Sequence, residues 1–220
     1  MKPVPADAVI VDLDGTLVDT LGDFEVALNA MLADLQLPCV EREDVRRWVG
    51  RGSEHLIACA LTHTTGQPDG GLAAPGWLHY QRHYARINGR HSAVYPGALD
   101  AFQAWQHRGL LLACLTNKPA AFARSLLRMK GLEGCFVRVF GGDDFPEKKP
   151  HPLPVLKTCE ALGTVPQRTL VVGDSRNDAQ AARAAGCPVV LVTYGYNHGE
   201  PVTGVDADGW VASMQDIALA

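Results

Sequence analysis

The chain has 220 residues, of which 47% are apolar and 20% are charged, so it can bury a substantial core and is not expected to be mainly disordered. Its formal net charge of -4 gives no basic surface of the kind that nucleic-acid binding requires. No apolar run approaches the roughly 18 residues of a membrane-spanning helix, so neither nucleic acid nor a membrane is an expected partner.

The N-terminal residues and the cysteines bear on the location of the protein. Met1–Asp7 contains one lysine and two prolines and leads into a short apolar run, which is not the pattern of a signal peptide. The six cysteines are scattered without a CxxC pair, and Cys114 lies inside an apolar run. Buried, reduced thiols explain this better than a disulfide or zinc framework. We therefore expect a cytoplasmic protein.

The first predicted element is a strand at Val9–Leu13, followed by a long helical interval. The run is continuously apolar rather than alternating, which predicts a strand buried on both faces, as in a parallel sheet. Nearly 100 residues then follow without a convincing strand pattern, while apolar residues recur at helical spacing from Leu21 to Ile87. We interpret residues 16–95 as an inserted helical domain, with a loop at Gln67–Gly76.

From Pro96 onward, predicted helices and strands alternate. The helices are Pro96–His107, Ala120–Lys130, Leu153–Leu162 and Ala179–Ala185, and the strands are Leu110–Leu115, a weaker Phe136–Phe140, Thr169–Val172 and Val189–Thr193. Gly186 is placed to cap the last helix. The alternation predicts an α/β fold with a doubly wound, mostly parallel sheet, formed by residues 1–15 and 96–220.

Ligands of open α/β sheets bind outside the carboxyl ends of the strands, and the first predicted strand ends in Asp12-Leu13-Asp14-Gly15. Residues two apart in extended backbone point to the same side. Two carboxylates there would repel each other unless a cation lay between them, and oxygen ligands favour a hard ion such as Mg²⁺. A turn or capping cluster is the alternative for this motif alone.

The next two groups supply donors for an anion. Thr116 and Asn117 follow the second strand just before a helix, where a hydroxyl and free N–H groups form an anion site, although a helix N-cap has the same pattern. Lys149 lies beside prolines, which restrict its freedom near a helix start. It is suited to neutralise charge on a transferring phosphoryl group, with a solvated basic loop as the alternative.

The last group is Gly173-Asp174-Ser175, with Asp178 four residues after the first acid. Asp174 is expected to complete a metal site, and Asp178 and Ser175 to support it by hydrogen bonds without contacting the metal. An N-capping aspartate is the alternative here. All four groups follow predicted parallel strands at one sheet edge, and together they are a full set for phosphoryl transfer on a small phosphate ester.

These residues, in this order, resemble the haloacid dehalogenase superfamily over nearly the whole chain. Asp12–Thr20 matches its first motif, Thr116 the second, Lys149 the third, and Asp174 with Asp178 the fourth. The insert looks like the helical cap of that superfamily. Within it, the sequence is similar to the bacterial phosphoglycolate phosphatases, on the segments Trp48–Ser53, Lys149–Pro152, Val172–Asp178 and Thr193–Glu200.

The resemblance implies hydrolysis of 2-phosphoglycolate to glycolate and phosphate with Mg²⁺. Asp12 would attack phosphorus and form an aspartyl-phosphate, while Asp14 would act as acid and then as base. Mg²⁺ would be bound by the Asp12 carboxylate, the Asp14 carbonyl and Asp174. Thr116, the Asn117 N–H and Lys149 would hold the phosphoryl oxygens.

Substrate specificity is expected to come from the insert. Arg51, flanked by Gly50 and Gly52, is the predicted reader of the substrate carboxylate, with a solvated loop residue as the alternative. The loop Tyr194–His198 is expected at the same sheet edge. His79 and His83 have the spacing of a zinc pair, but no third ligand is evident in the sequence.

Two other functions stay open at this point. A related sugar-phosphate phosphatase or phosphomutase would use the same core residues with different contacts from the insert. A nucleotide-binding or interaction module with the same fold is the rival from another class. Neither GxGxxG nor GxxxxGK[ST] follows the first strand, which counts against that module.

Overall fold

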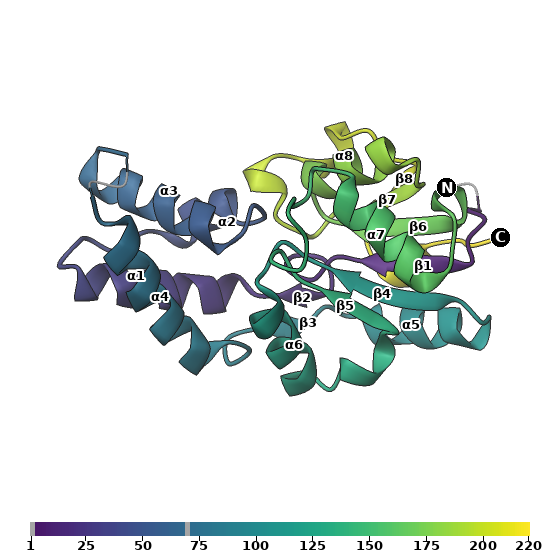
Figure 1. The fold of residues 1–220 in the computed structure, drawn as a ribbon, viewed down its shortest axis with the longest axis horizontal. Coiled ribbons are helices and arrows are strands. Elements are labelled where there is room, and N and C mark those ends of the chain that lie inside the picture. Colours follow the sequence, from purple (N-terminus) through teal and green to yellow (C-terminus); the bar gives the residue numbers. More distant parts are fainter. Residues whose placement is uncertain (1–2, 69–70) are drawn as a thin grey trace.

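The computed structural model describes residues 3–68 and 71–220, and within them the core is a six-stranded, all-parallel sheet (Figure 1). The strands are β1 (Ala8–Val11), β4 (Leu111–Leu115), β5 (Arg138–Phe140), β6 (Thr169–Gly173), β7 (Val189–Val192) and β8 (Gly209–Val211). Their order is β5-β4-β1-β6-β7-β8. The five predicted strands are confirmed, and β8 was missed.

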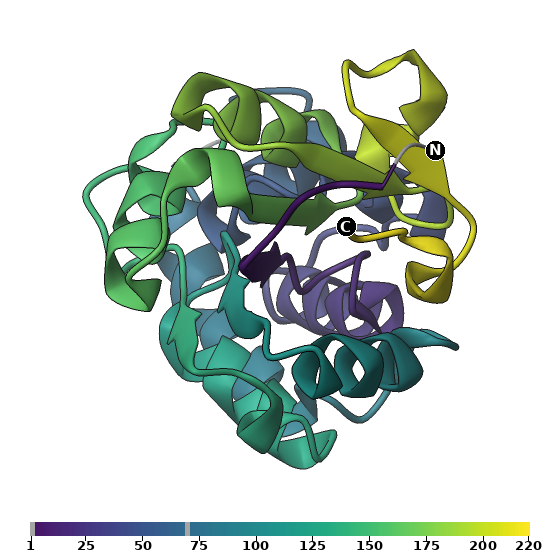
Figure 2. The same cartoon turned by 90° about the vertical axis from the view of Figure 1, so that its right-hand side faces the viewer.

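Helices cover both faces of this sheet, as a doubly wound fold requires. They are α5 (Ala98–His107), α6 (Ala120–Met129), α7 (Leu153–Leu162) and α8 (Arg176–Ala185). Val9 and Val11 pack with α5 and α6, whereas Ala8 and Ile10 pack with α7 and α8. Figure 2, viewed from the end where both termini lie, shows the two helix pairs on opposite sides of the sheet. The predicted α/β fold is confirmed.

Four helices lie between two short strands in the described part of residues 16–95. They are α1 (Leu21–Asp34), α2 (Arg42–Trp48), α3 (Ser53–Thr65) and α4 (Ala73–Ile87), and they share an apolar core of their own. The strands β2 (Val18–Asp19) and β3 (Ala93–Val94) pair antiparallel where the chain leaves and rejoins the sheet. We call α1–α4 the helical insert. It lies beyond the carboxyl ends of the sheet strands (Figure 1).

The predicted loop Gln67–Gly76 is partly wrong. Residues 69–70 lie outside the described chain, but α4 already begins at Ala73. Pro75 fits there because N–H groups in the first turn of a helix have no hydrogen-bond acceptor within the helix, so the N–H that proline lacks is not needed. Gly76 packs against Leu61, so this segment is held by the insert core. Among the described residues, no helix has the length and apolarity needed to cross a membrane.

Candidate active site

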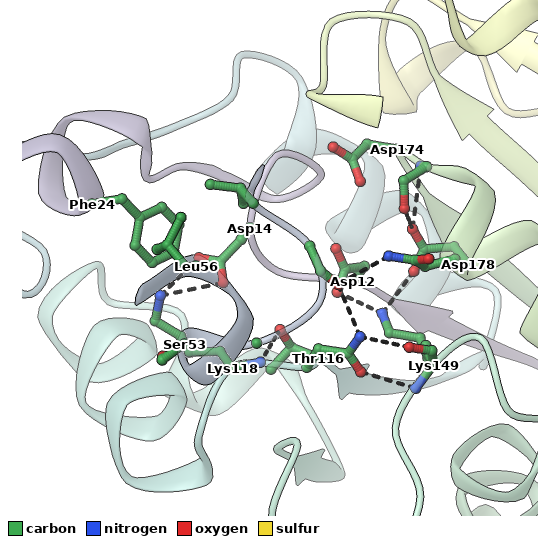
Figure 3. Close-up of a pocket in the computed structure, with 16 residues that line it drawn as sticks. Asp12, Asp14, Phe24, Ser53, Leu56, Thr116, Lys118, Lys149, Asp174 and Asp178 are labelled. Atoms are coloured by element: carbon green, nitrogen blue, oxygen red, sulfur yellow. Dashed lines mark hydrogen bonds and ion pairs between the residues drawn. The ribbon is translucent and has the colours of Figure 1, made fainter. Parts of the chain in front are cut away.

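The carboxyl ends of three neighbouring strands form the floor of a pocket (Figure 3). Val11 of β1 pairs with Cys114 of β4 on one side and Val172 of β6 on the other. The residues that follow these strands, Asp12, Thr116 and Asp174, therefore meet at one edge. The pocket has about 470 Å³ of space free of protein atoms. The other lining residues from the α/β core are Asp14, Asn117, Lys118, Lys149, Ser175, Asn177 and Asp178. Residues 16–95 contribute six more, Phe24, Val49, Gly50, Gly52, Ser53 and Leu56.

Asp12, Asp174 and Asp178 form a buried acidic cluster. One carboxylate oxygen of each lies within 4.8 Å of the others. Burial raises the pKa of Asp12 to about 7, with Lys149 opposing and Asp178 adding to the rise. Burial, together with Asp178 and Asp12, raises the pKa of Asp174 well above its usual value. Three ionised carboxylates beside one lysine leave two negative charges uncompensated, so this donor set fits one divalent cation.

Lys149 is buried inside this cluster, and the alternative of a solvated loop does not apply. Its Nζ donates to Asp12 Oδ1 at 2.6 Å, to Asp178 Oδ1 at 2.7 Å and to the Leu115 carbonyl at 2.8 Å. Burial disfavours the ammonium charge, but the Asp12 and Asp178 carboxylates outweigh it and raise the pKa of Lys149. Its backbone is held as well, since Asn117 exchanges two side-chain hydrogen bonds with the Lys149 N–H and carbonyl.

Asp178 and Ser175 form the start of α8. Asp178 Oδ2 accepts hydrogen bonds from the Ser175 N–H at 3.2 Å and the Ser175 hydroxyl at 2.7 Å, in a capping box. The sequence placed Asp178 outside the metal ligands. The structure brings its carboxylate into the acidic cluster while the same group caps the helix, so the capping interpretation is confirmed and does not exclude a role in the site.

Asp14 points to the other end of the pocket. Its carboxylate pairs with Lys118 Nζ at 2.9 Å and 3.2 Å and accepts a hydrogen bond from the Thr20 hydroxyl at 2.8 Å. The Lys118 ammonium lies over the rings of Phe24 and Tyr84, 4.3 Å and 4.8 Å from their centroids. Sequence reasoning missed Lys118, although it directly follows the predicted anion site at Thr116 and Asn117.

The side chains of the core hold the loop that carries Gly50. The Gly50 carbonyl accepts from Asn117 Nδ2 at 2.9 Å and from Asn177 Nδ2 at 3.0 Å. Thr116 is buried and its hydroxyl accepts from the Lys118 N–H. The Asn117 side chain thus contacts Gly50 of the inserted residues 16–95. This contact is in addition to the predicted role of the Asn117 backbone N–H as an anion donor.

Arg51 lies away from the pocket surface. Gly50 and Gly52 line the pocket with positive φ angles of 115° and 92°, but Arg51 is exposed and is not among the lining residues that the structure describes. Its charge adds to burial in lowering the pKa of His55 and of His198. The predicted role of Arg51 as carboxylate reader therefore has no contact in the pocket to support it.

The predicted loop Tyr194–His198 contacts Asp174 without lining the pocket. The Tyr196 N–H donates to Asp174 Oδ2 at 2.7 Å, and the Tyr196 hydroxyl donates to Asp19 Oδ1 at 2.7 Å. No residue of this loop lines the described pocket surface. His79 and His83 both bond Asp34 Oδ2, at 2.8 Å and 2.7 Å, in an ion-pair cluster with Arg82 on the insert.

Known hydrolases and phosphatases are similar to this chain over most of its length. The haloacid dehalogenase-like hydrolase family matches residues 6–186. The chain is 43% identical to a phosphoglycolate phosphatase of Thiobacillus denitrificans, with 99% of this chain and 96% of that protein covered. It is 39% identical to the phosphoglycolate phosphatase of Escherichia coli, with 96% and 91% covered.

Solved structures show the same fold. A crystal structure of a predicted phosphoglycolate phosphatase from Haemophilus somnus superposes with a TM-score of 0.89 at 34% identity, and 96% of each chain is covered. The CbbY protein of Rhodobacter sphaeroides, solved in complex with phosphate, gives a TM-score of 0.82 at 26% identity, again with 96% of each chain covered.

Proposed function

This chain belongs to the haloacid dehalogenase-like hydrolases, and on that basis we propose that it is a Mg²⁺-dependent phosphoglycolate phosphatase. The observation that carries the proposal is the buried cluster of Asp12, Asp174 and Asp178, with Lys149 paired to Asp12 and Asp178, at the floor of a pocket. Relatives named phosphoglycolate phosphatase at 39–43% identity over nearly the full length support the substrate. The cytoplasmic location stays a prediction.

In the proposed reaction Asp12 is the nucleophile. Its carboxylate oxygen forms a bond to phosphorus as the bond from phosphorus to the ester oxygen breaks, which leaves an aspartyl-phosphate and glycolate. Water then attacks phosphorus, the acyl phosphate bond breaks, and phosphate leaves with Asp12 restored. The Lys149 ammonium beside Asp12 is placed to compensate charge on the phosphoryl oxygens, together with the Thr116 hydroxyl and the Asn117 N–H.

Asp14 moves the proton. In the first step it gives a proton to the leaving alkoxide oxygen, and in the second it takes one from the attacking water. Its carboxylate lies apart from the acidic cluster and lines the pocket beside Lys118, as a group that serves the leaving side of the ester must. Bound Mg²⁺, held by the Asp12 and Asp174 carboxylates and the Asp14 carbonyl, would stabilise negative charge on the phosphoryl group.

The test is a panel of phosphate monoesters assayed with Mg²⁺ on the purified protein. We expect phosphoglycolate to lead sugar phosphates by at least about tenfold in kcat/KM. If a sugar phosphate led instead, the related sugar-phosphate phosphatase or phosphomutase would be the better assignment. If even an aryl phosphate were not hydrolysed, the non-catalytic module with this fold would be favoured.

A further inference from the structure

The two ends of the pocket have different chemistry (Figure 3). Asp12, Asp174 and Asp178 cluster at one end, where Lys149 pairs with Asp12 and Asp178, and the proposed function assigns this end to phosphate. At the other end a second lysine, Lys118, pairs with Asp14 next to the helical insert. The proposed reaction uses only the first lysine. A substrate with two anionic groups would be favoured by a cation at each end.

The Lys118 side chain is held in place to a degree unusual for lysine. It is 1% exposed, and its ammonium lies between Asp14 and the faces of Phe24 and Tyr84. A lysine normally keeps its charged end in water, because burying an ammonium is costly without a partner. Here aromatic rings of the insert and a carboxylate of the core fix it at the pocket surface, so little conformational freedom remains to be lost when an anion binds.

Lys118 already binds a carboxylate and retains donor capacity. An ammonium has three N–H donors. Within the described chain, the hydrogen-bond acceptors of Lys118 Nζ are the two oxygens of one group, the Asp14 carboxylate. A second carboxylate in the pocket can therefore approach the same ammonium. Lys149, in contrast, donates to three separate acceptors, which occupy all of its N–H groups.

The wall of the pocket on the insert side favours the same ligand. Gly52 is the N-cap of α3, a 13-residue helix, and no side chain among the residues that the structure describes caps its first N–H groups. Gly52 and the buried Ser53 line the pocket, so the start of this helix, where negative charge is favoured, lies at the pocket wall. Phe24 and Leu56 add apolar surface to the same wall.

We propose that Lys118 binds the substrate carboxylate and so selects phosphate esters that carry a carboxylate one methylene away from the ester oxygen. The inference rests on the proposed function. Phosphate occupies the Asp12 end, and the carboxylate occupies the Lys118 end, where the start of α3 assists it. The reader of the second anion is then a core residue, positioned by the insert through Phe24 and Tyr84, in place of the exposed Arg51.

The test compares two esters in three variants. Phosphoglycolate and 2-hydroxyethyl phosphate differ at the tail by a charge. We expect Lys118→Met to lower the ratio of their kcat/KM values by roughly 10- to 100-fold, as expected when a charged hydrogen bond is lost. Lys148→Met is the matched control, because Lys148 is a more exposed lysine paired with Glu54 beside the pocket. It and Arg51→Met should leave the ratio within about threefold of wild type.

The outcomes separate the two proposals. If the wild type does not prefer phosphoglycolate, the proposed function fails whatever the variants do. If it does, and Lys118→Met slows both esters equally or Arg51→Met alone lowers the ratio, Lys118 is not the reader. Should Lys118→Met not fold, binding of 3-phosphonopropionate with Mg²⁺ is measured by calorimetry on Asp14→Asn and on Asp14→Asn/Lys118→Met. An affinity that does not fall at least about tenfold in the double variant would likewise overturn the assignment.

Discussion

Lys149 joins three parts of the chain through one ammonium group, since it bonds Asp12 after β1, Asp178 on α8 and the carbonyl that ends β4. Lys149→Met leaves the buried carboxylates without their cation, so we expect a loss of about 3–5 kcal/mol in the free energy of unfolding, together with loss of turnover. Urea denaturation of the metal-free protein measures the first.

The control for this prediction is Lys157→Met. Lys157 forms an exposed ion pair with Glu160 and is 49% exposed, so its loss should change stability by less than about 0.5 kcal/mol. Equal stability of the two variants would mean that the buried lysine does not hold the site together.

Asp14→Asn tests the proton that the proposed reaction assigns to this residue. An alkoxide is a poor leaving group and needs the proton, whereas nitrophenolate leaves without it. We expect kcat for phosphoglycolate to fall by about 100-fold or more, and kcat for 4-nitrophenyl phosphate to fall far less. Steady-state kinetics on both esters measures this, and equal losses would remove Asp14 as the acid.

At this scale the sequence predicted where charged residues stand but not what surrounds them. Asp12 lies at the end of a predicted strand, Thr116 and Asp174 lie just after two others, and the strand order brings the three together, as expected. Lys118 escaped notice because a lysine at a helix start is usually solvated. Its burial depends on Phe24 and Tyr84, which come from a distant segment that no local pattern relates to it.

At the scale of elements, the end of β6 and the start of α8 are packed too closely for any side chain at Gly173. A Cβ there would overlap the Asp178 carboxyl group. Gly173→Ala should therefore displace Asp178 from Lys149 and cost roughly 1–3 kcal/mol, with a matching loss of activity, as measured by thermal unfolding and by assay. Gly134→Ala is the control, because no atom of residues 3–68 and 71–220 lies within 4 Å of its Cβ position, and it should behave like wild type.

Elements with a strong local pattern were predicted well. The helix Leu153–Leu162 was predicted with its observed bounds, since a proline precedes it and Gly163 caps it with a φ of 70°. The strand β8 was missed because its three residues include an exposed tryptophan, Trp210, and give no apolar run. The two-residue strands β2 and β3 depend on pairing across the whole insert, which the sequence does not display.

At the scale of the whole molecule, the buried acids make stability depend on pH and on Mg²⁺ together. The folded-state pKa of Asp12 is about 7, above its ordinary value of 3.8, and that of Asp174 is raised as well. Such groups contribute stability that is fully present below about pH 4 and lost as the pH rises through about 7. The metal-free protein should therefore lose stability between these values.

A divalent cation reverses this loss, because it stabilises the ionised carboxylates. We expect Mg²⁺ to raise Tm by roughly 5–10 °C more at pH 8 than at pH 5, as measured by scanning calorimetry at matched ionic strength. In Asp174→Asn the difference should shrink. A rise in Tm that is independent of pH would show that Mg²⁺ does not bind at these carboxylates.

Tyr196 makes hydrogen bonds both to the acidic cluster and to the residues where the helical insert begins. Its N–H bonds Asp174, while its hydroxyl donates to Asp19 and accepts from the N–H groups of Thr20 and Leu21, where the insert begins. Tyr196→Phe should weaken Mg²⁺ binding severalfold in calorimetric titration although no metal contact is removed. In Tyr194→Phe, whose hydroxyl bonds Thr16 instead, the affinity should change less.

Tyr196 thus links the start of the helical insert to the acidic cluster at the sheet edge. A movement of the helical insert relative to the sheet would either break the hydrogen bonds of the Tyr196 hydroxyl or displace the Tyr196 N–H that donates to Asp174. Because energetic coupling is reciprocal, a Mg²⁺ ion bound at Asp174 would in turn restrict the movement of the insert.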